Sequence, residues 1–146
     1  MNARKTVLAA CATLALVLTG CAHMGESARP TSARQHVVIQ VSDADPGKWN
    51  LALNNARNIQ RDMSAGNVDI EIVAYGPGIG MLEKDSAVAQ RIDQASLSGM
   101  KISACENTMR ARKLAKPDML DGIGYVPSGV VEIMKRQQEG WSYLRP

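Results

Sequence analysis

Phenylalanine is absent from this chain of 146 residues, and aromatic residues make up only 3% of it. The core must therefore be aliphatic, with some of the eight methionines filling irregular gaps in it. Nucleic-acid binding surfaces combine clusters of lysine and arginine with aromatic side chains on which bases stack. No such interleaved cluster occurs here, so we do not expect a nucleic-acid partner.

Cysteine and histidine are also scarce, with three and two residues respectively. Metal sites built from these residues need several ligands at characteristic spacings, and no such spacing is present. The glycine-rich stretch at 76–80 lacks the spacing of a P-loop or a dinucleotide-binding fingerprint. We therefore expect no metal centre, and no motif predicts a bound cofactor.

No hydrophobic run reaches the length of about 20 residues that a membrane-spanning helix needs. The run at residues 6–18 follows Arg4 and Lys5, an arrangement typical of a secretory leader. It ends in the sequence LTGC at residues 18–21, which resembles the bacterial lipobox. In that motif the cysteine receives diacylglycerol and becomes the new N-terminus. We interpret residues 1–20 as a lipoprotein signal peptide.

Cys21 is accordingly the expected lipidation site. An ordinary secretory leader with a nearby cut is the alternative, and Cys11 has too little apolar sequence before it to be the acylated residue. Ala22 stands where an aspartate would favour inner-membrane retention in enterobacterial-type sorting. This resemblance predicts a lipid anchor in the outer membrane, with the protein facing the periplasm.

Residues 21–35 contain serine, alanine, arginine and proline without apolar periodicity, so we expect a flexible tether there. Residues 36–146 form the expected folded domain. Two of the 17 basic residues, Arg4 and Lys5, lie in the leader, so 15 basic residues face 14 acidic ones in the rest of the chain. This balance predicts neither a strongly basic nor a strongly acidic partner.

Short apolar runs predict five strands, at residues 36–42, 68–75, 100–105, 123–126 and 141–144. Helical patterns lie between them. The first begins at Pro46 after an Asp45 N-cap and ends at Gly66, with one apolar face that consists of Trp49, Leu53, Ala56, Ile59 and Met63. The pattern predicts further helices from Asp85 or Ser86 to Gly99, from Glu106 to Lys116, and from about Gly129 to Glu139. Val130, Val131 and Met134 are the expected apolar face of the last.

Strands that alternate with helices at this spacing predict an α/β domain with a mainly parallel sheet and helices on both faces. The carboxyl ends of parallel strands meet at one edge, where ligands of such folds bind. That edge is predicted to carry Ser42 and Asp43, the turn at 76–78, Cys105 with Asn107, and the turn at 127–129.

Three segments resemble one family: ACENT at 104–108, YGPGI at 75–79 and the tail at 127–146, which begins PSGVVEI. They are similar to DsrE/DsrF-like proteins, in particular to their small stand-alone branch. The resemblance implies a five-stranded α/β/α sandwich of three layers that assembles into homo-oligomers, usually trimers or hexamers. It also implies a sulfur carrier that holds a persulfide on a cysteine, and Cys105 is the matching position.

Cys105 is the expected functional residue of the domain. A thiol at a strand-to-helix junction lies near unpaired backbone N–H groups, which favour the thiolate. Asn107 and Thr108 are candidates for hydrogen bonds to a persulfide or anion. The alternative is a small buried hydrophobe, because free cysteine is among the most buried residue types. The expected pocket around the cysteine consists of Gly76, Pro77, Gly78, Asn107, Thr108, Ser128 and Gly129.

The sequence therefore predicts a sulfur-relay carrier or sulfane-sulfur binding protein, which would need donor and acceptor proteins. The alternative is a non-catalytic ligand-binding or assembly domain in which Cys105 is structural. An independent enzyme is the weakest interpretation, because no acid–base pair accompanies the cysteine.

Overall fold

A computed structural model describes residues 33–146 of the chain, and the proposed signal peptide and most of the proposed tether lie outside these residues. Five strands form one sheet in the order β4-β3-β2-β1-β5, and every neighbouring pair is parallel. The strands are β1 (Gln35–Val41), β2 (Val68–Ala74), β3 (Lys101–Cys105), β4 (Gly124–Val126) and β5 (Ser142–Leu144). The predicted α/β fold with a parallel sheet of five strands is thereby confirmed.

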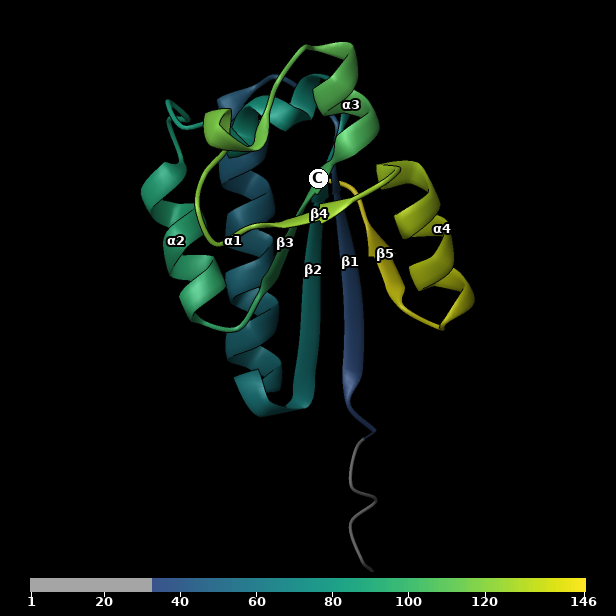
Figure 1. Ribbon diagram of the computed structural model, residues 1–146. Coiled ribbons are helices and arrows are strands. Elements are labelled where there is room, and N and C mark those ends of the chain that lie inside the picture. Colours follow the sequence, from purple (N-terminus) through teal and green to yellow (C-terminus); the bar gives the residue numbers. More distant parts are fainter. Residues whose placement is uncertain (1–32) are drawn as a thin grey trace, which may run out of the picture.

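Helices cover both faces of this sheet (Figure 1). Helix α1 (Pro46–Met63) packs on β1 and β2, and α2 (Ala89–Leu97) packs beside it on β3. Helix α4 (Gly129–Gln138) covers the opposite face, and the short α3 (Glu106–Ala111) follows the carboxyl end of β3. Three 3-10 segments complete the fold: η1 (Ala65–Asn67), η2 (Gly76–Leu82) and η3 (Lys116–Asp118). The described part of the chain is thus a three-layer α/β/α sandwich.

Helix α1 begins as its sequence predicts. The Asp45 carboxylate accepts a hydrogen bond of 2.8 Å from the Gly47 N–H, and Pro46 occupies the first turn. The prediction for the far end is wrong, because α1 ends at Met63, its C-cap Ser64 has a φ of +67°, and Gly66 belongs to η1. Met63 is exposed rather than part of the apolar face. The last turn of α1 therefore contributes little to the core.

The two middle helices are shorter than predicted. Helix α2 begins at Ala89 instead of Asp85 or Ser86, because residues 85–88 form turns. Helix α3 ends at Ala111 instead of Lys116. Lys113 adopts a left-handed φ of +59° there, its N–H bonds to the Arg110 carbonyl, and the Leu114 N–H bonds to the Met109 carbonyl. This pair of bonds is a Schellman motif, which ends the helix with a lysine at the position where glycine is usual.

The α4 face of the sheet contains a buried carboxylate instead of a continuous apolar layer. Glu71, on the central strand β2, is fully buried and accepts hydrogen bonds of 2.7 Å from the Ser103 hydroxyl and from Arg136 Nε. Lys101 Nζ lies 2.9 Å from the same carboxylate. Arg136 also pairs with Glu132, one turn earlier on α4. A buried charge needs such partners, because an unpaired one costs several kcal/mol.

This network explains why the predicted apolar face of α4 is wrong. Ile133 is the buried apolar residue of the helix body, and Glu132 and Arg136 share the sheet-facing side with it. Val130, Val131 and Met134 are 48%, 44% and 57% exposed. The helix is turned by the need to neutralise Glu71, which leaves three apolar side chains in contact with solvent.

Candidate functional site

The carboxyl ends of β1 to β4 meet at one edge of the sheet, at the upper end of the strands in Figure 1. The segments that follow them are η2 after β2, α3 after β3 and α4 after β4. Backbone bonds join these segments: the Tyr75 N–H donates to the Val41 carbonyl over 3.1 Å, and the Asn107 N–H donates to the Pro127 carbonyl over 3.2 Å. The segments predicted to form the site are thus neighbours in the fold.

Two glycines at this edge are required by close contacts. A Cβ on Gly78 would lie 2.4 Å from the Val41 carbonyl oxygen, so only glycine lets η2 pass this close to the end of β1. A Cβ on Gly129 would lie 3.0 Å from Cβ of Tyr75 and 3.1 Å from its ring. Glycine at 129 thus brings the first turn of α4 against the strand ends.

Cys105 is the last residue of β3 and the N-cap of α3. It is only 4% exposed, and its sulfur accepts a hydrogen bond of 3.2 Å from the Gly129 N–H. The sequence places these two residues 24 positions apart, and the parallel β3–β4 pair brings them together. It is also the one free cysteine among residues 33–146, because Cys11 and Cys21 lie outside the described residues.

Burial and hydrogen bonding have opposite effects on the pKa of the Cys105 thiol. Burial raises the pKa of the thiol, but hydrogen bonds from the Thr108 hydroxyl and from the backbone N–H groups of Gly129, Thr108 and Asn107 stabilise the thiolate. The net effect holds the pKa of Cys105 below its ordinary value. The contribution of the Asn107 N–H, which also donates to the Pro127 carbonyl, is the smallest of these.

Thr108 connects Cys105 to η2. Its hydroxyl oxygen accepts a hydrogen bond of 2.9 Å from the Gly76 N–H, where φ is +53°, and the same hydroxyl lowers the pKa of the Cys105 thiol. One side chain on α3 therefore fixes the turn after β2 and also influences the ionisation of Cys105. The predicted neighbourhood of Thr108, Gly76 and Cys105 exists in the structure.

The other predicted residues surround the cysteine in different ways. The Asn107 side-chain oxygen accepts a hydrogen bond from Arg110 and lies on the exposed side of α3. Ser128 is the N-cap of α4, but its hydroxyl makes no capping hydrogen bond. Gly129 contributes its backbone N–H to the sulfur, as described above. The polar atoms around Cys105 are thus mainly backbone atoms, with Thr108 as the contributing side chain.

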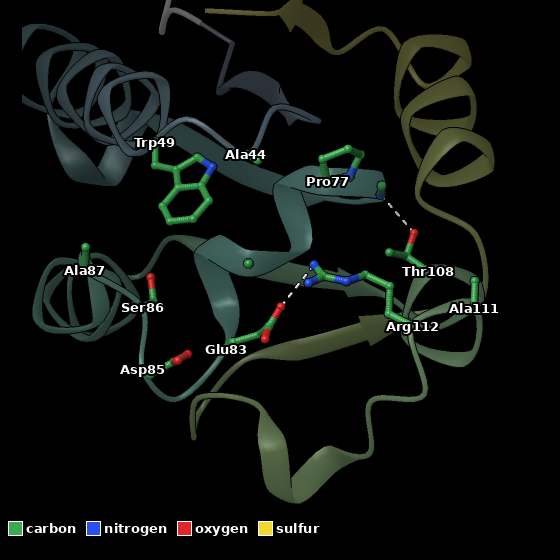
Figure 2. Close-up of a pocket in the computed structure, with 12 residues that line it drawn as sticks. Ala44, Trp49, Pro77, Glu83, Asp85, Ser86, Ala87, Thr108, Ala111 and Arg112 are labelled. Atoms are coloured by element: carbon green, nitrogen blue, oxygen red, sulfur yellow. Dashed lines mark hydrogen bonds and ion pairs between the residues drawn. The ribbon is translucent and has the colours of Figure 1, made fainter.

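A cavity of about 720 Å³ opens at the same edge, on the side where α1 and α2 lie (Figure 2). Of the predicted pocket residues, Gly76, Pro77 and Thr108 line it, and Cys105 does not. Sequence reasoning missed the other lining residues, which are Ala44, Trp49, Gly80, Glu83, Asp85, Ser86, Ala87, Ala111 and Arg112. The one available signal was the polar segment 83–86 after η2, of which Asp85 or Ser86 is predicted from the sequence to start a helix.

Neither a metal-ligand cluster nor a membrane-spanning helix is found among the described residues. Between residues 33 and 146, no three histidine, cysteine, aspartate or glutamate side chains are grouped closely enough to hold a metal ion. Within the same range, no helix combines the length and the hydropathy that crossing a bilayer requires.

Solved structures with the same fold include three stand-alone proteins. One, of unknown function, from Methanobacterium thermoautotrophicum, is 37% identical, with a TM-score of 0.74, and the match covers 77% of this chain and 99% of that one. The ychN protein from E. coli is 16% identical (TM-score 0.63; 77% and 99% covered). A conserved protein of unknown function from Bacteroides thetaiotaomicron is 19% identical (TM-score 0.65; 80% and 98% covered). The last two likenesses establish the fold alone.

These three relatives are matched over nearly their whole lengths, so the described region corresponds to complete folded proteins. No protein with a curated description matches the chain. Comparison with known families matches residues 35–146 to the DsrE/DsrF-like family, a span that includes Cys105 and every strand and helix described above. The chain therefore belongs to the DsrE/DsrF-like family.

Proposed function

We propose that this protein is a sulfur carrier in which Cys105 holds a sulfane sulfur as a persulfide. The observation that carries the proposal is the environment of the Cys105 sulfur. A lowered pKa, a hydrogen bond from the Gly129 N–H and the Thr108 hydroxyl all favour the thiolate, which is the nucleophilic form of cysteine. Membership of the DsrE/DsrF-like family supports a role in sulfur relay.

The proposed transfer is a thiol–disulfide type of exchange. The Cys105 thiolate attacks the outer sulfur of a donor persulfide, R–S–SH, and forms a new S–S bond. The S–S bond of the donor breaks, its electron pair leaves on R–S⁻, and the product is the Cys105 persulfide. With thiosulfate, the same attack releases sulfite. No external oxidant or reductant is needed, because the transferred sulfur brings its oxidation state with it.

Burial of the thiol is consistent with an oxidising periplasm. An exposed low-pKa cysteine there is liable to oxidation to sulfenic and higher acids. Cys105 is only 4% exposed, and its sulfur lies against the first residue of α4, Gly129. A donor sulfur must therefore enter a narrow space, which favours small sulfane-sulfur compounds or a partner that displaces α4.

We further propose that Cys21 carries a lipid and anchors the domain to the outer membrane, facing the periplasm. A flexible tether of about 14 residues between Cys21 and β1 would give an average span of roughly 20 Å. Replacing Cys21 with serine is expected to move the protein from the membrane fraction to the soluble fraction. Unchanged fractionation of Cys21→Ser would refute the anchor.

We also propose that the domain forms homo-oligomers, as trimers or hexamers. The exposed apolar side chains of Val130, Val131 and Met134 on α4 support an interface there, because monomers seldom leave neighbouring apolar groups on one helix face in water.

A second function is supported by a different observation. The same low exposure of Cys105 and its packing against Gly129 suit a structural cysteine in a non-catalytic ligand-binding or assembly domain. The two functions differ in one measurable property, the reactivity of the thiol in the folded protein.

The deciding experiment is intact mass spectrometry of residues 33–146 after incubation with polysulfide or thiosulfate. A gain of one or more sulfur atoms that dithiothreitol removes, and that Cys105→Ser lacks, is the expected result. Alkylation by iodoacetamide before and after unfolding serves as a control for access. If no sulfur is gained and the thiol is alkylated only after unfolding, Cys105 is structural and the carrier function is refuted.

A further inference from the structure

The cavity between η2, the start of α1, the segment before α2, and α3 has the size of a small-molecule site. Its volume of about 720 Å³ lies within the range of about 300–1,000 Å³ that is typical of ligand pockets. Cys105 does not line it, and apart from Gly76 and Thr108 the lining residues take no part in the proposed persulfide chemistry. Its walls therefore have to be explained by another role.

One wall of the cavity is apolar and rigid. The Trp49 indole N–H donates a hydrogen bond of 2.7 Å to the Asp43 carbonyl, which fixes the ring in place. Trp49 is only 7% exposed, and a Cβ on Gly80 would lie 3.3 Å from Cη2 of its ring, so Gly80 packs against the benzo end of the indole where both residues line the cavity. Pro77, Ala87 and other small residues continue this surface (Figure 2).

The opposite wall is charged, and its net charge is negative. Arg112 is paired with Glu83, with 3.0 Å between Nη1 and Oε1, so its positive charge is neutralised. Oε1 of Glu83 is buried, and this ion pair is its one polar contact among residues 33–146. Asp85 lines the same cavity and has neither an ion pair nor a side-chain hydrogen bond within the described part of the chain.

We propose that this cavity binds a small organic cation, namely an ammonium group on an aromatic or otherwise apolar body. An ammonium group supplies hydrogen-bond donors to the Asp85 carboxylate, which has no partner within the described part of the chain, and it offsets the negative charge of this wall. The Trp49 ring and the small residues beside it supply an apolar surface against which a flat body packs. An anionic ligand would meet two carboxylates and one arginine that is already paired.

The test compares three probes of the same size and different charge: phenethylammonium, 2-phenylethanol and 3-phenylpropionate. Residues 33–146 contain two tryptophans, Trp49 and Trp141, so two indole N–H signals are expected in a ¹H–¹⁵N NMR spectrum, and Trp141→Phe assigns them. Phenethylammonium is expected to shift the Trp49 signal saturably and to leave that of Trp141 in place. No saturable shift, or binding of 3-phenylpropionate as tight as that of phenethylammonium, would overturn the proposal.

Two pairs of variants locate the site. Asp85→Asn is expected to weaken phenethylammonium binding about fivefold, as expected for the loss of one charge at contact distance, and to leave 2-phenylethanol unaffected. Asp93→Asn makes the same charge change on the exposed side of α2 and is expected to bind normally. Ala87→Phe fills the cavity and is expected to abolish binding. Ala65→Phe, at η1 and outside the cavity lining, is expected to leave binding unchanged. If the two variants of either pair bind phenethylammonium with equal affinity, the cavity is not its binding site. This conclusion does not depend on the outcome of the sulfur-loading experiment.

Discussion

Replacing Thr108 with valine removes one hydroxyl group from the surroundings of Cys105 and keeps the shape of the side chain. In the native protein this hydroxyl accepts from the Gly76 N–H over 2.9 Å, and it is the side-chain group that lowers the pKa of Cys105. It is the one side-chain donor among the groups that lower the pKa of the thiol, since the others are backbone N–H groups. Thr108→Val is therefore the change that tests the electrostatic part of the proposed function.

The size of the effect follows from the charge on the acceptor. A hydrogen bond to an ionised group contributes about 1.5–3 kcal/mol, and each 1.36 kcal/mol changes a protonation equilibrium tenfold. We expect the variant to have a higher Cys105 pKa and a thiolate population about 10- to 100-fold lower at a pH below that pKa. Thr108→Ser keeps the hydroxyl and serves as the matched control.

The assay is the rate of iodoacetamide alkylation of Cys105 as a function of pH in the folded protein. The midpoint of this profile is expected to lie at higher pH in Thr108→Val than in the wild type and in Thr108→Ser. If the midpoint of Thr108→Val coincides with that of the wild type, the hydroxyl does not stabilise the thiolate and the reasoning fails.

Thr108→Val is also expected to change how the free energy of unfolding depends on pH. Because the folded-state pKa of Cys105 is lowered, its contribution to the free energy of unfolding is fully present above the unfolded pKa of about 8.5 and is lost as the pH falls through the folded pKa. Thr108→Val is therefore expected to be more destabilising at pH 9 than at pH 6 in urea unfolding under reducing conditions. An equal loss at both pH values would contradict the predicted ionisation.

Three further predictions concern the fold and the surface. Arg136→Met leaves the buried Glu71 with Lys101 as its one cation among the described residues. We therefore expect the free energy of unfolding, measured in urea, to fall by about 3 kcal/mol. A decrease below about 1 kcal/mol would show that the ion-pair network is dispensable. Lys113→Gly relieves the left-handed φ of +59° and is expected to raise the free energy of unfolding by about 0.5–1 kcal/mol, which thermal denaturation measures; a lowered melting temperature would refute this. Met134→Glu places a charge on the exposed apolar face of α4 and is expected to lower the oligomeric mass measured by light scattering. Lys135→Glu, at the neighbouring position, is expected to leave that mass unchanged. An unchanged mass in Met134→Glu would exclude this face as an interface.

The sequence predicted the elements that depend on local chemistry. Asp45 and Pro46 start α1 as expected, and all five predicted strands occur within one or two residues of their predicted bounds. The alternation of strands and helices also placed Cys105 and Gly129 at one edge, because parallel strands end together.

Long-range charge pairing accounts for what the sequence did not predict. Nothing near Val130 or Met134 in the sequence indicates that α4 turns its charged side toward Glu71, which lies more than 50 residues earlier. The cavity likewise combines residues from four separate segments, among them Trp49 and Arg112, and each of these segments alone has an ordinary helix or turn pattern. The Schellman end at Lys113 was missed because the usual glycine is not there.

The parallel sheet has a practical consequence for attaching the protein to a surface or to a fusion partner. Every strand begins at one edge and ends at the other, so β1 enters at Gln35 on the edge opposite Cys105, and the residues after β5 reach the same edge as Cys105 (Figure 1). Arg145 there lies 3.7 Å from Asp43, close to the cavity. A tag placed after Pro146 would crowd both sites, whereas attachment before Gln35 would present them, uncovered, to a solution of donors or ligands.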